Sequence, residues 1–116
     1  MERKVLLVYY SPGAQQRLEK ALRGQQLQIH SVDGRRSETM GAVRGQPIKV
    51  VVVDHGANDL NVRQAVRQIG QMMPRSLVMA VYEDRDSVDI YERAQRIGTA
   101  ESLGAALQRY LPSSIT

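Results

Sequence analysis

Four apolar runs of strand length occur in the first 82 residues, separated by segments with helical spacing. KVLLVYY (4–10), IKVVVVD (48–54) and SLVMAVY (76–82) are continuous enough to be buried on both faces of a sheet. LQIHSV (27–32) instead alternates apolar and polar residues, as a half-buried edge strand does. The valine-rich run is the most apolar of the four, so we expect it at the centre of the sheet.

Apolar residues at helical spacing fill two of the intervals between these runs. A first helix is predicted to begin after Ser11, which is a good capping residue and is followed by proline, and to close at Gly24. A second helix is predicted to begin at Asp59 or Asn61 and to end before Pro74.

Two further segments are ambiguous. Residues 34–45 carry a weak helical pattern that Gly41 interrupts. In residues 86–97, Asp86 is placed to cap a helix, but VDIY (88–91) equally suits a short fifth strand. Periodicity alone does not decide between a helix and a strand there.

A last helix is predicted to be capped by Thr99. Its apolar residues share one face, formed by Leu103, Ala106, Leu107, Tyr110 and Leu111. Strand and helix thus alternate with short connections, which is typical of an α/β domain with a parallel sheet. Crossovers are expected to be right-handed, and any site should lie at the carboxyl ends of the strands.

Composition narrows the class of protein. A chain of 116 residues with 42% hydrophobic and 24% charged residues suits one globular domain, which we place at residues 1–112 with 113–116 as a tail or the start of a linker. The absence of cysteine excludes disulfides and thiolate metal sites. No apolar run reaches the length of a membrane span and no signal-peptide pattern opens the chain, so a cytoplasmic location is expected.

The net charge of +4 comes mainly from scattered arginines, with a single doublet at Arg35 and Arg36. Nucleic-acid binding proteins usually cluster their basic residues and interleave aromatic ones for stacking. We therefore expect no direct nucleic-acid partner and no membrane partner.

The order KVLLVYYSPGAQQRLEKAL, IKVVVVDHG and LVMAVYED resembles the receiver domain of bacterial response regulators over nearly the whole chain. The resemblance implies a three-layer αβα, flavodoxin-like fold with a doubly wound parallel sheet in the strand order 2-1-3-4-5. The region of the fourth helix and fifth strand is shortened. It also implies that Asp54 occupies the place of the family's phosphoacceptor.

The groups that support phosphorylation in that family are replaced here. The acidic pair that would hold Mg²⁺ after the first strand is replaced by Tyr9 and Tyr10, and Ala80 stands where a hydroxyl residue would sense the phosphate. No lysine follows Lys49 to pair with a phosphoryl group. Phosphoryl transfer depends on positioning and charge neutralisation, so we expect Asp54 to cap its strand. One of the tyrosines should fill the vacated metal pocket.

These departures predict a non-enzymatic signal-transduction module, a pseudo-receiver without Mg²⁺-dependent phosphorylation, metal or cofactor. It would bind a partner signalling protein or itself as a homodimer, through a last-helix face that includes Leu103, Leu107 and Tyr110. Two alternatives stay open: a working receiver phosphorylated at Asp54 by a histidine kinase, and a small flavodoxin-like enzyme or ligand-binding domain. His55 and the acidic loop with Glu83, Asp84 and Asp86 are interpreted as solvated loop residues.

Overall fold

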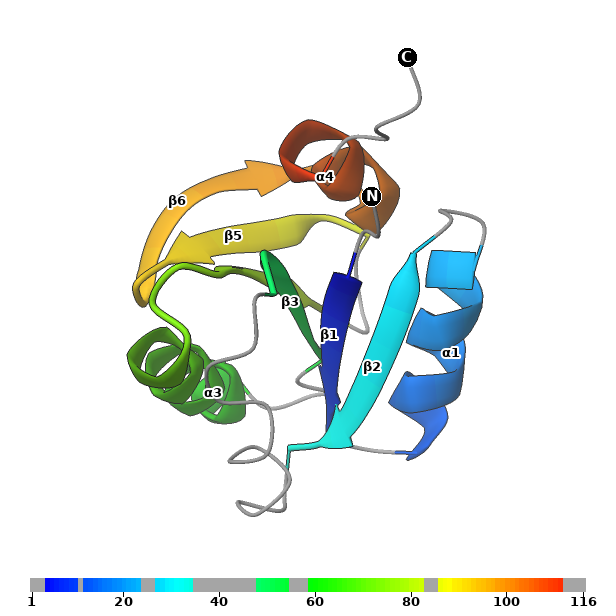
Figure 1. Cartoon of the computed structure of the whole chain (residues 1–116), viewed down its shortest axis with the longest axis horizontal. Coiled ribbons are helices and arrows are strands. Elements are labelled where there is room, and N and C mark those ends of the chain that lie inside the picture. Colours follow the sequence, from blue (N-terminus) through cyan, green and yellow to red (C-terminus); the bar gives the residue numbers. More distant parts are fainter. Residues whose placement is uncertain are drawn as a thin grey trace.

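A six-stranded mixed sheet forms the centre of the structure, and helices cover both of its faces (Figure 1). The computed structural model describes residues 4–10, 12–23, 27–34, 48–54, 59–82 and 86–111. In chain order the elements are β1 (Lys4–Tyr9), α1 (Pro12–Arg23), β2 (Gln28–Asp33), β3 (Val50–Asp54), α3 (Asp59–Met72), β4 (Leu77–Val81), β5 (Val88–Glu92), β6 (Gln95–Ala100) and α4 (Leu103–Tyr110). The weak helix considered after Gly34 and the tail at 113–116 lie outside the described residues.

The first four strands form the parallel half of the sheet. β1 pairs in parallel with β2 and with β3, and β3 pairs in parallel with β4. β2 is at the edge, as its alternating pattern predicted. The four valines of β3 are all 0% exposed, which confirms that this run is buried on both faces. Each such side chain contributes roughly 1.5–2 kcal/mol of hydrophobic stabilisation.

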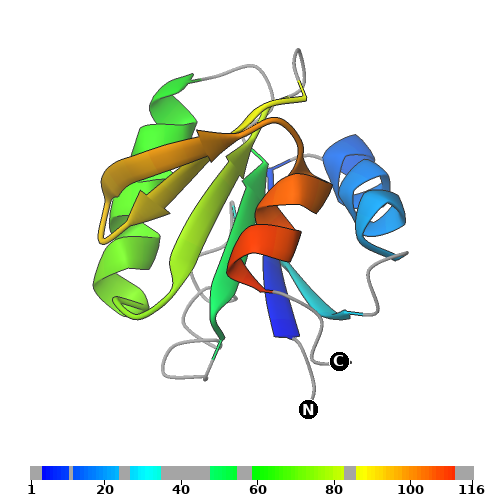
Figure 2. The ribbon, with the colours of Figure 1, turned by 90° about the horizontal axis from the view of Figure 1, so that it is seen from above.

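The core consists of two clusters on opposite sides of the sheet. Figure 2 shows the helices that flank the sheet on these two sides. Successive strand residues point to opposite faces, so Val51 and Val53 join the cluster under α3, whereas Val50 and Val52 join the cluster under α1 and α4. We call these faces the α3 side and the α1/α4 side. The buried helix residues divide in the same way, with Ala65, Val66, Ile69 and Met73 on the α3 side and Leu18, Leu22, Ala106 and Leu107 on the other.

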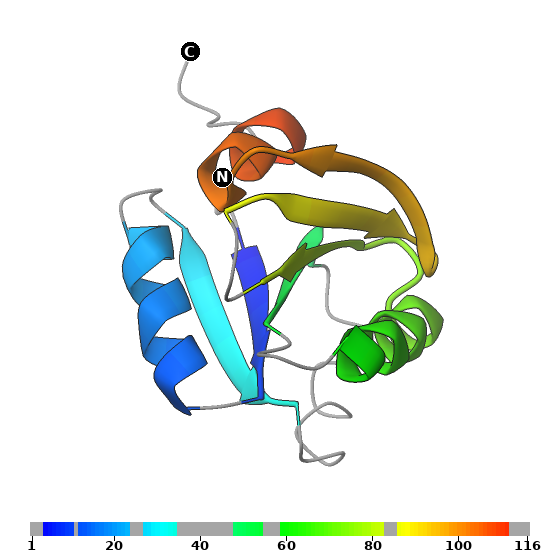
Figure 3. The ribbon, with the colours of Figure 1, turned by 180° about the vertical axis from the view of Figure 1, so that it is seen from behind.

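The second half of the sheet is antiparallel, and the predicted doubly wound parallel sheet is therefore wrong. β5 pairs antiparallel with β4, and β6 with β5 (Figure 3). Only residues 82–87 separate β4 from β5, which is too short for the crossover that a parallel strand needs, about a dozen residues or more. Arg93 and Ala94 have φ of 51° and 66°, as a two-residue turn of a tight hairpin requires. Of the two readings of residues 86–97, the strand is correct and the helix is not.

The last helix begins later than its sequence pattern predicted. Thr99 belongs to β6, where it pairs with Asp89, so it does not cap a helix. Ser102 is the cap instead, because its extended backbone lets its Oγ accept a hydrogen bond of 3.1 Å from the backbone N–H of Ala105. The hairpin thus takes the residues that the prediction assigned to the start of α4.

Candidate functional site

Asp54 ends β3 with a side chain that is 0% exposed. It follows Val53 in the strand, so it lies on the α1/α4 side of the sheet, the side that α1 covers. Arg17 of α1, which is 46% exposed, donates from Nη2 to Asp54 Oδ1 at 3.4 Å. A buried carboxylate is stable only with such a compensating charge or hydrogen bond. The sequence shows Arg17 only as one of several scattered arginines. The structure pairs it with Asp54, whose buried carboxylate needs a partner of opposite charge.

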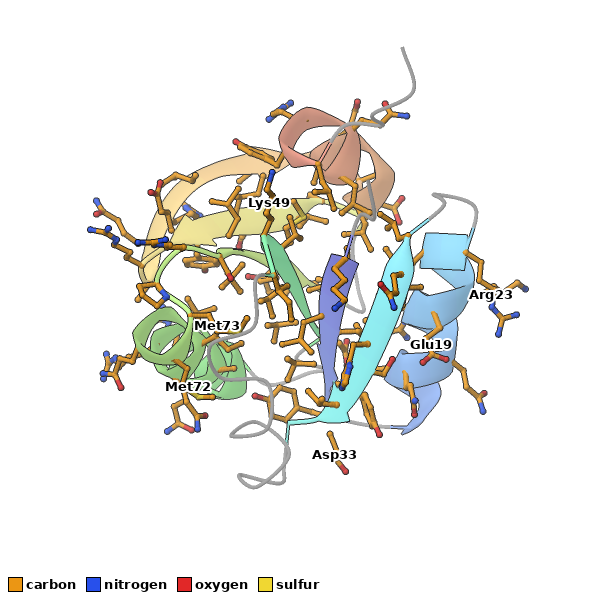
Figure 4. The ribbon with its side chains drawn as sticks, viewed as in Figure 1. Glu19, Arg23, Asp33, Lys49, Met72 and Met73 are labelled. Carbon is orange, nitrogen blue, oxygen red and sulfur yellow. The ribbon has the colours of Figure 1, made fainter. Side chains whose placement is uncertain are left out.

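A hydrogen bond from β2 to Glu19, which a second bond within α1 supports, holds the helix that carries Arg17. Ser31 Oγ donates to Glu19 Oε1 at 2.6 Å, and Gln15 Nε2 donates to the same oxygen at 3.3 Å. Glu19 lies on the part of α1 nearest β2, whereas Arg23 extends from the outer side of the helix (Figure 4). These contacts fix α1 along the sheet and so place the Arg17 guanidinium at the carboxyl end of β3.

The two tyrosines after β1 lie on different sides of the sheet. Tyr10 packs against the cluster on the α3 side, and its ring occupies the space in which a Cβ on Gly34 would lie, 2.6 Å from Tyr10 Cζ. Burial, and secondly the negative charge of Asp33, raises the pKa of Tyr10. Tyr9 is the last residue of β1, and alternation places it on the α1/α4 side, the side of Asp54. The sheet therefore separates Tyr10 from the carboxylate of Asp54.

Ala80 is likewise on the α3 side, fully buried in the cluster there. The three positions that the resemblance grouped around one pocket, Tyr10, Asp54 and Ala80, are thus divided between the two faces. Asp54 and Arg17 remain as the polar pair on one face.

A second polar pair, which the sequence interpretation missed, joins β4 to β5. Tyr82 donates from its hydroxyl to Asp89 Oδ2 at 2.6 Å, and Asp89 is only 8% exposed. The pKa of Tyr82 is strongly raised, mainly by burial and then by the hydrogen bond and the charge of Asp89. In VDIY, strand alternation places Asp89 on the same face as Tyr91. The sequence could therefore have indicated the position of Asp89 only if this segment had been interpreted as a strand.

The last-helix face predicted to bind a partner packs against the sheet of its own chain. Leu107 is fully buried there, and Leu103 and Tyr110 are partly buried against the same cluster. Arg109 stacks over the ring of Tyr110, 5.9 Å from its centroid, and donates to the carbonyl of Thr99 at 3.3 Å.

The sequence predicts solvated loop residues after β3 and after β4. His55, Glu83 and Asp84 lie outside the described residues, and Asp86 is exposed. Among the described side chains, no three of the residue types that bind metals gather into a possible metal site. None of the described helices combines the length and the apolar character that a membrane span needs.

The chemistry available at the end of β3 is charge pairing between a buried acid and a half-exposed guanidinium. A carboxylate oxygen that takes up a phosphoryl group must meet the donor at roughly 3–3.5 Å, which requires access from solvent. No family model, curated protein or solved structure matches this chain in comparisons with known proteins. The function is therefore argued from the geometry of the chain itself.

Proposed function

We propose that this chain is a non-enzymatic, cytoplasmic signal-transduction module that acts by binding a partner protein, without Mg²⁺-dependent phosphorylation of Asp54. The observation that supports this is the state of Asp54, which is 0% exposed and ion-paired with Arg17. The proposal keeps the signalling role implied by the receiver resemblance but not the receiver fold, since two of the five strand pairings are antiparallel.

The physical argument concerns access and charge. A receiving carboxylate needs an open face for the phosphoryl donor and a divalent cation whose coordination sphere it shares. Arg17 instead supplies a fixed guanidinium that balances the charge of Asp54 through a hydrogen bond. A guanidinium donates hydrogen bonds but does not coordinate oxygen ligands as Mg²⁺ does, so it neutralises Asp54 without joining the acid and a phosphoryl donor in one coordination sphere. Asp54 then serves to attach α1 to the end of β3.

The test is exposure of the purified chain to acetyl phosphate with Mg²⁺, followed by intact-mass measurement. We expect no added phosphoryl mass, in the wild type or in an Asp54→Asn control. A phosphoryl adduct in the wild type that Asp54→Asn abolishes would instead establish the alternative of a working receiver. Beryllofluoride with Mg²⁺, followed by amide NMR, provides an independent readout, because a working acceptor would shift the amide signals around Asp54.

A further inference from the structure

A second surface, formed by α3 and the β5–β6 hairpin, carries four of the exposed arginines among the described residues. It consists of Arg63 and Arg67 on α3 together with Arg93, Arg96 and Ile97 of the β5–β6 hairpin, all exposed. We propose that this α3–hairpin surface docks an acidic segment of the partner protein. The proposal rests on the proposed function, since it names the surface and the chemistry of that partner.

Close packing between the hairpin turn and α3 brings the two halves of the surface together. A Cβ on Gly70 would lie 3.2 Å from the backbone N of Ala94 and 3.4 Å from the carbonyl carbon of Arg93. Figures 1 and 3 show the same turn beside α3 from opposite sides. Arg63 and Arg67 lie seven and three residues before Gly70, so they share its flank of the helix. The α3 residues and the hairpin residues of this surface therefore meet at Gly70.

The charge of this surface is of one sign over its length. Residues 63–72 and 93–99 contain four arginines and no acidic residue, and the nearest acid along the hairpin is Glu92. In α1, by contrast, the basic residues share the helix with Glu19. Arginine presents a planar fork of donors that matches a carboxylate in a two-bond arrangement. Neighbouring guanidiniums one helical turn apart thus fit carboxylates spaced along a partner chain.

Ile97 gives the surface an apolar contact point. Its side chain is 47% exposed, and it is the one large hydrophobic side chain that is exposed among the described residues. The pairing of β6 with β5 shifts register at this position, between the pairs Ile90–Gly98 and Tyr91–Arg96, so Ile97 occupies a bulge in the edge strand. Bulges and charges on an edge strand discourage strand addition. The partner is therefore expected to make side-chain contacts, with an apolar residue on Ile97 and carboxylates on the arginines.

The absence of an exposed aromatic ring on this surface favours a protein over a nucleic acid. The neighbouring tyrosines, Tyr82 and Tyr91, are partly buried, and Tyr82 is hydrogen-bonded to Asp89. Binding of single-stranded nucleic acid uses aromatic rings on which bases stack. A side chain such as Ile97, in contrast, contributes to the core of protein interfaces.

The experiment measures binding of a fluorescent synthetic peptide in which glutamates flank a leucine, at low ionic strength. A matched peptide with glutamine in place of glutamate is the ligand control. The variant Arg67→Glu/Arg96→Glu is compared with Lys20→Glu/Arg23→Glu, which reverses two exposed charges on α1 and has the same net charge. We expect the first variant to bind about tenfold more weakly or worse and the second to change by less than about twofold. In amide NMR the peptide should shift residues 63–71 and 91–99.

A third variant, Ile97→Ala, tests the apolar contact. It should weaken the binding of the leucine peptide but not of a peptide with glycine in place of leucine. All five substituted residues are exposed, so amide spectra of the variants should retain the wild-type pattern elsewhere.

Several results would overturn the proposal. These are equal weakening by both charge-reversal variants, peptide shifts that map elsewhere, no binding at low ionic strength, or a nucleic-acid oligonucleotide that displaces the peptide and binds more tightly. The outcome is separable from the test of Asp54. A chain that is phosphorylated but binds the peptide here refutes the proposed function alone, whereas an unphosphorylated chain that fails to bind the peptide refutes only this surface.

Discussion

Removing the charges of Asp54 and Arg17, singly and together, tests how this ion pair stabilises the end of β3. Asp54→Asn keeps the shape of the carboxylate and removes its charge, and Arg17→Gln keeps a hydrogen-bonding side chain of similar path without the guanidinium. The double variant completes a thermodynamic cycle. The coupling energy from the cycle isolates the pair from other contacts that either residue makes.

The separation of 3.4 Å between Arg17 Nη2 and Asp54 Oδ1 sets the expected size. Two unit charges at that distance attract by about 1 kcal/mol in water and by about 5 kcal/mol at an effective dielectric of about 20. Arg17 is 46% exposed, so solvent screens the pair and the value should fall near the lower limit. We expect a coupling of about 1–2 kcal/mol, with Arg17→Gln alone lowering the free energy of unfolding by a similar amount because the buried acid loses a donor.

Urea unfolding followed by far-UV circular dichroism at neutral pH measures all four proteins. The coupling should shrink when the ionic strength is raised to about 1 M, since one partner faces solvent. The substitution Arg23→Gln, at an exposed residue on the outer side of α1, provides the control and should change stability by less than about 0.5 kcal/mol. A coupling below about 0.3 kcal/mol would refute the reasoning, because it would mean that Arg17 does not compensate the charge of Asp54.

Three further features are tested by substitution. The pKa of Tyr82 is raised in the folded state above its ordinary value of 10.0, so the free energy of unfolding should decline as the pH rises beyond 10. In urea unfolding, Tyr82→Phe should make this decline with pH less steep. An unchanged pH dependence in the variant would contradict the prediction. Ala94→Gly should stabilise the hairpin by about 0.5–1 kcal/mol because φ is 66°, and a lower urea midpoint would count against the turn geometry. Gly34→Ala should lower the free energy of unfolding by about 1–3 kcal/mol, since its Cβ would meet the Tyr10 ring. Its control, Gly13→Ala, has open space around the added Cβ and should be neutral or stabilising. Equal urea midpoints for the two variants would argue against the packing of Tyr10 on Gly34.

Patterns that depend on neighbours in the chain were sufficient to predict most individual elements. The buried valine run of β3, the alternating edge strand β2 and the helices α1 and α3 all follow from the spacing of apolar residues and from capping residues such as those at the start of α1. These signals lie within a few residues of each other, because strand and helix periodicities are properties of the local backbone. The sequence also predicted Asp54 as the cap at the end of β3, but no local pattern indicated that its side chain is 0% exposed.

Contacts between distant segments decided the rest. The amino-acid order of residues 86–97 is compatible with a helix or a strand, and the short link from β4 together with the positive φ values of Arg93 and Ala94 makes this segment part of an antiparallel hairpin. The face on which a side chain lies depends on register, so Tyr10 and Asp54 ended on opposite sides of the sheet although both follow buried strands. Arg17, which pairs with Asp54, is 37 residues away from it in the chain, and no local sequence pattern predicts this pairing. The sequence determined the first four strands, the helices α1 and α3, and the acid that ends β3. The packing of those elements determined the hairpin of β5 and β6 and the guanidinium that neutralises that acid.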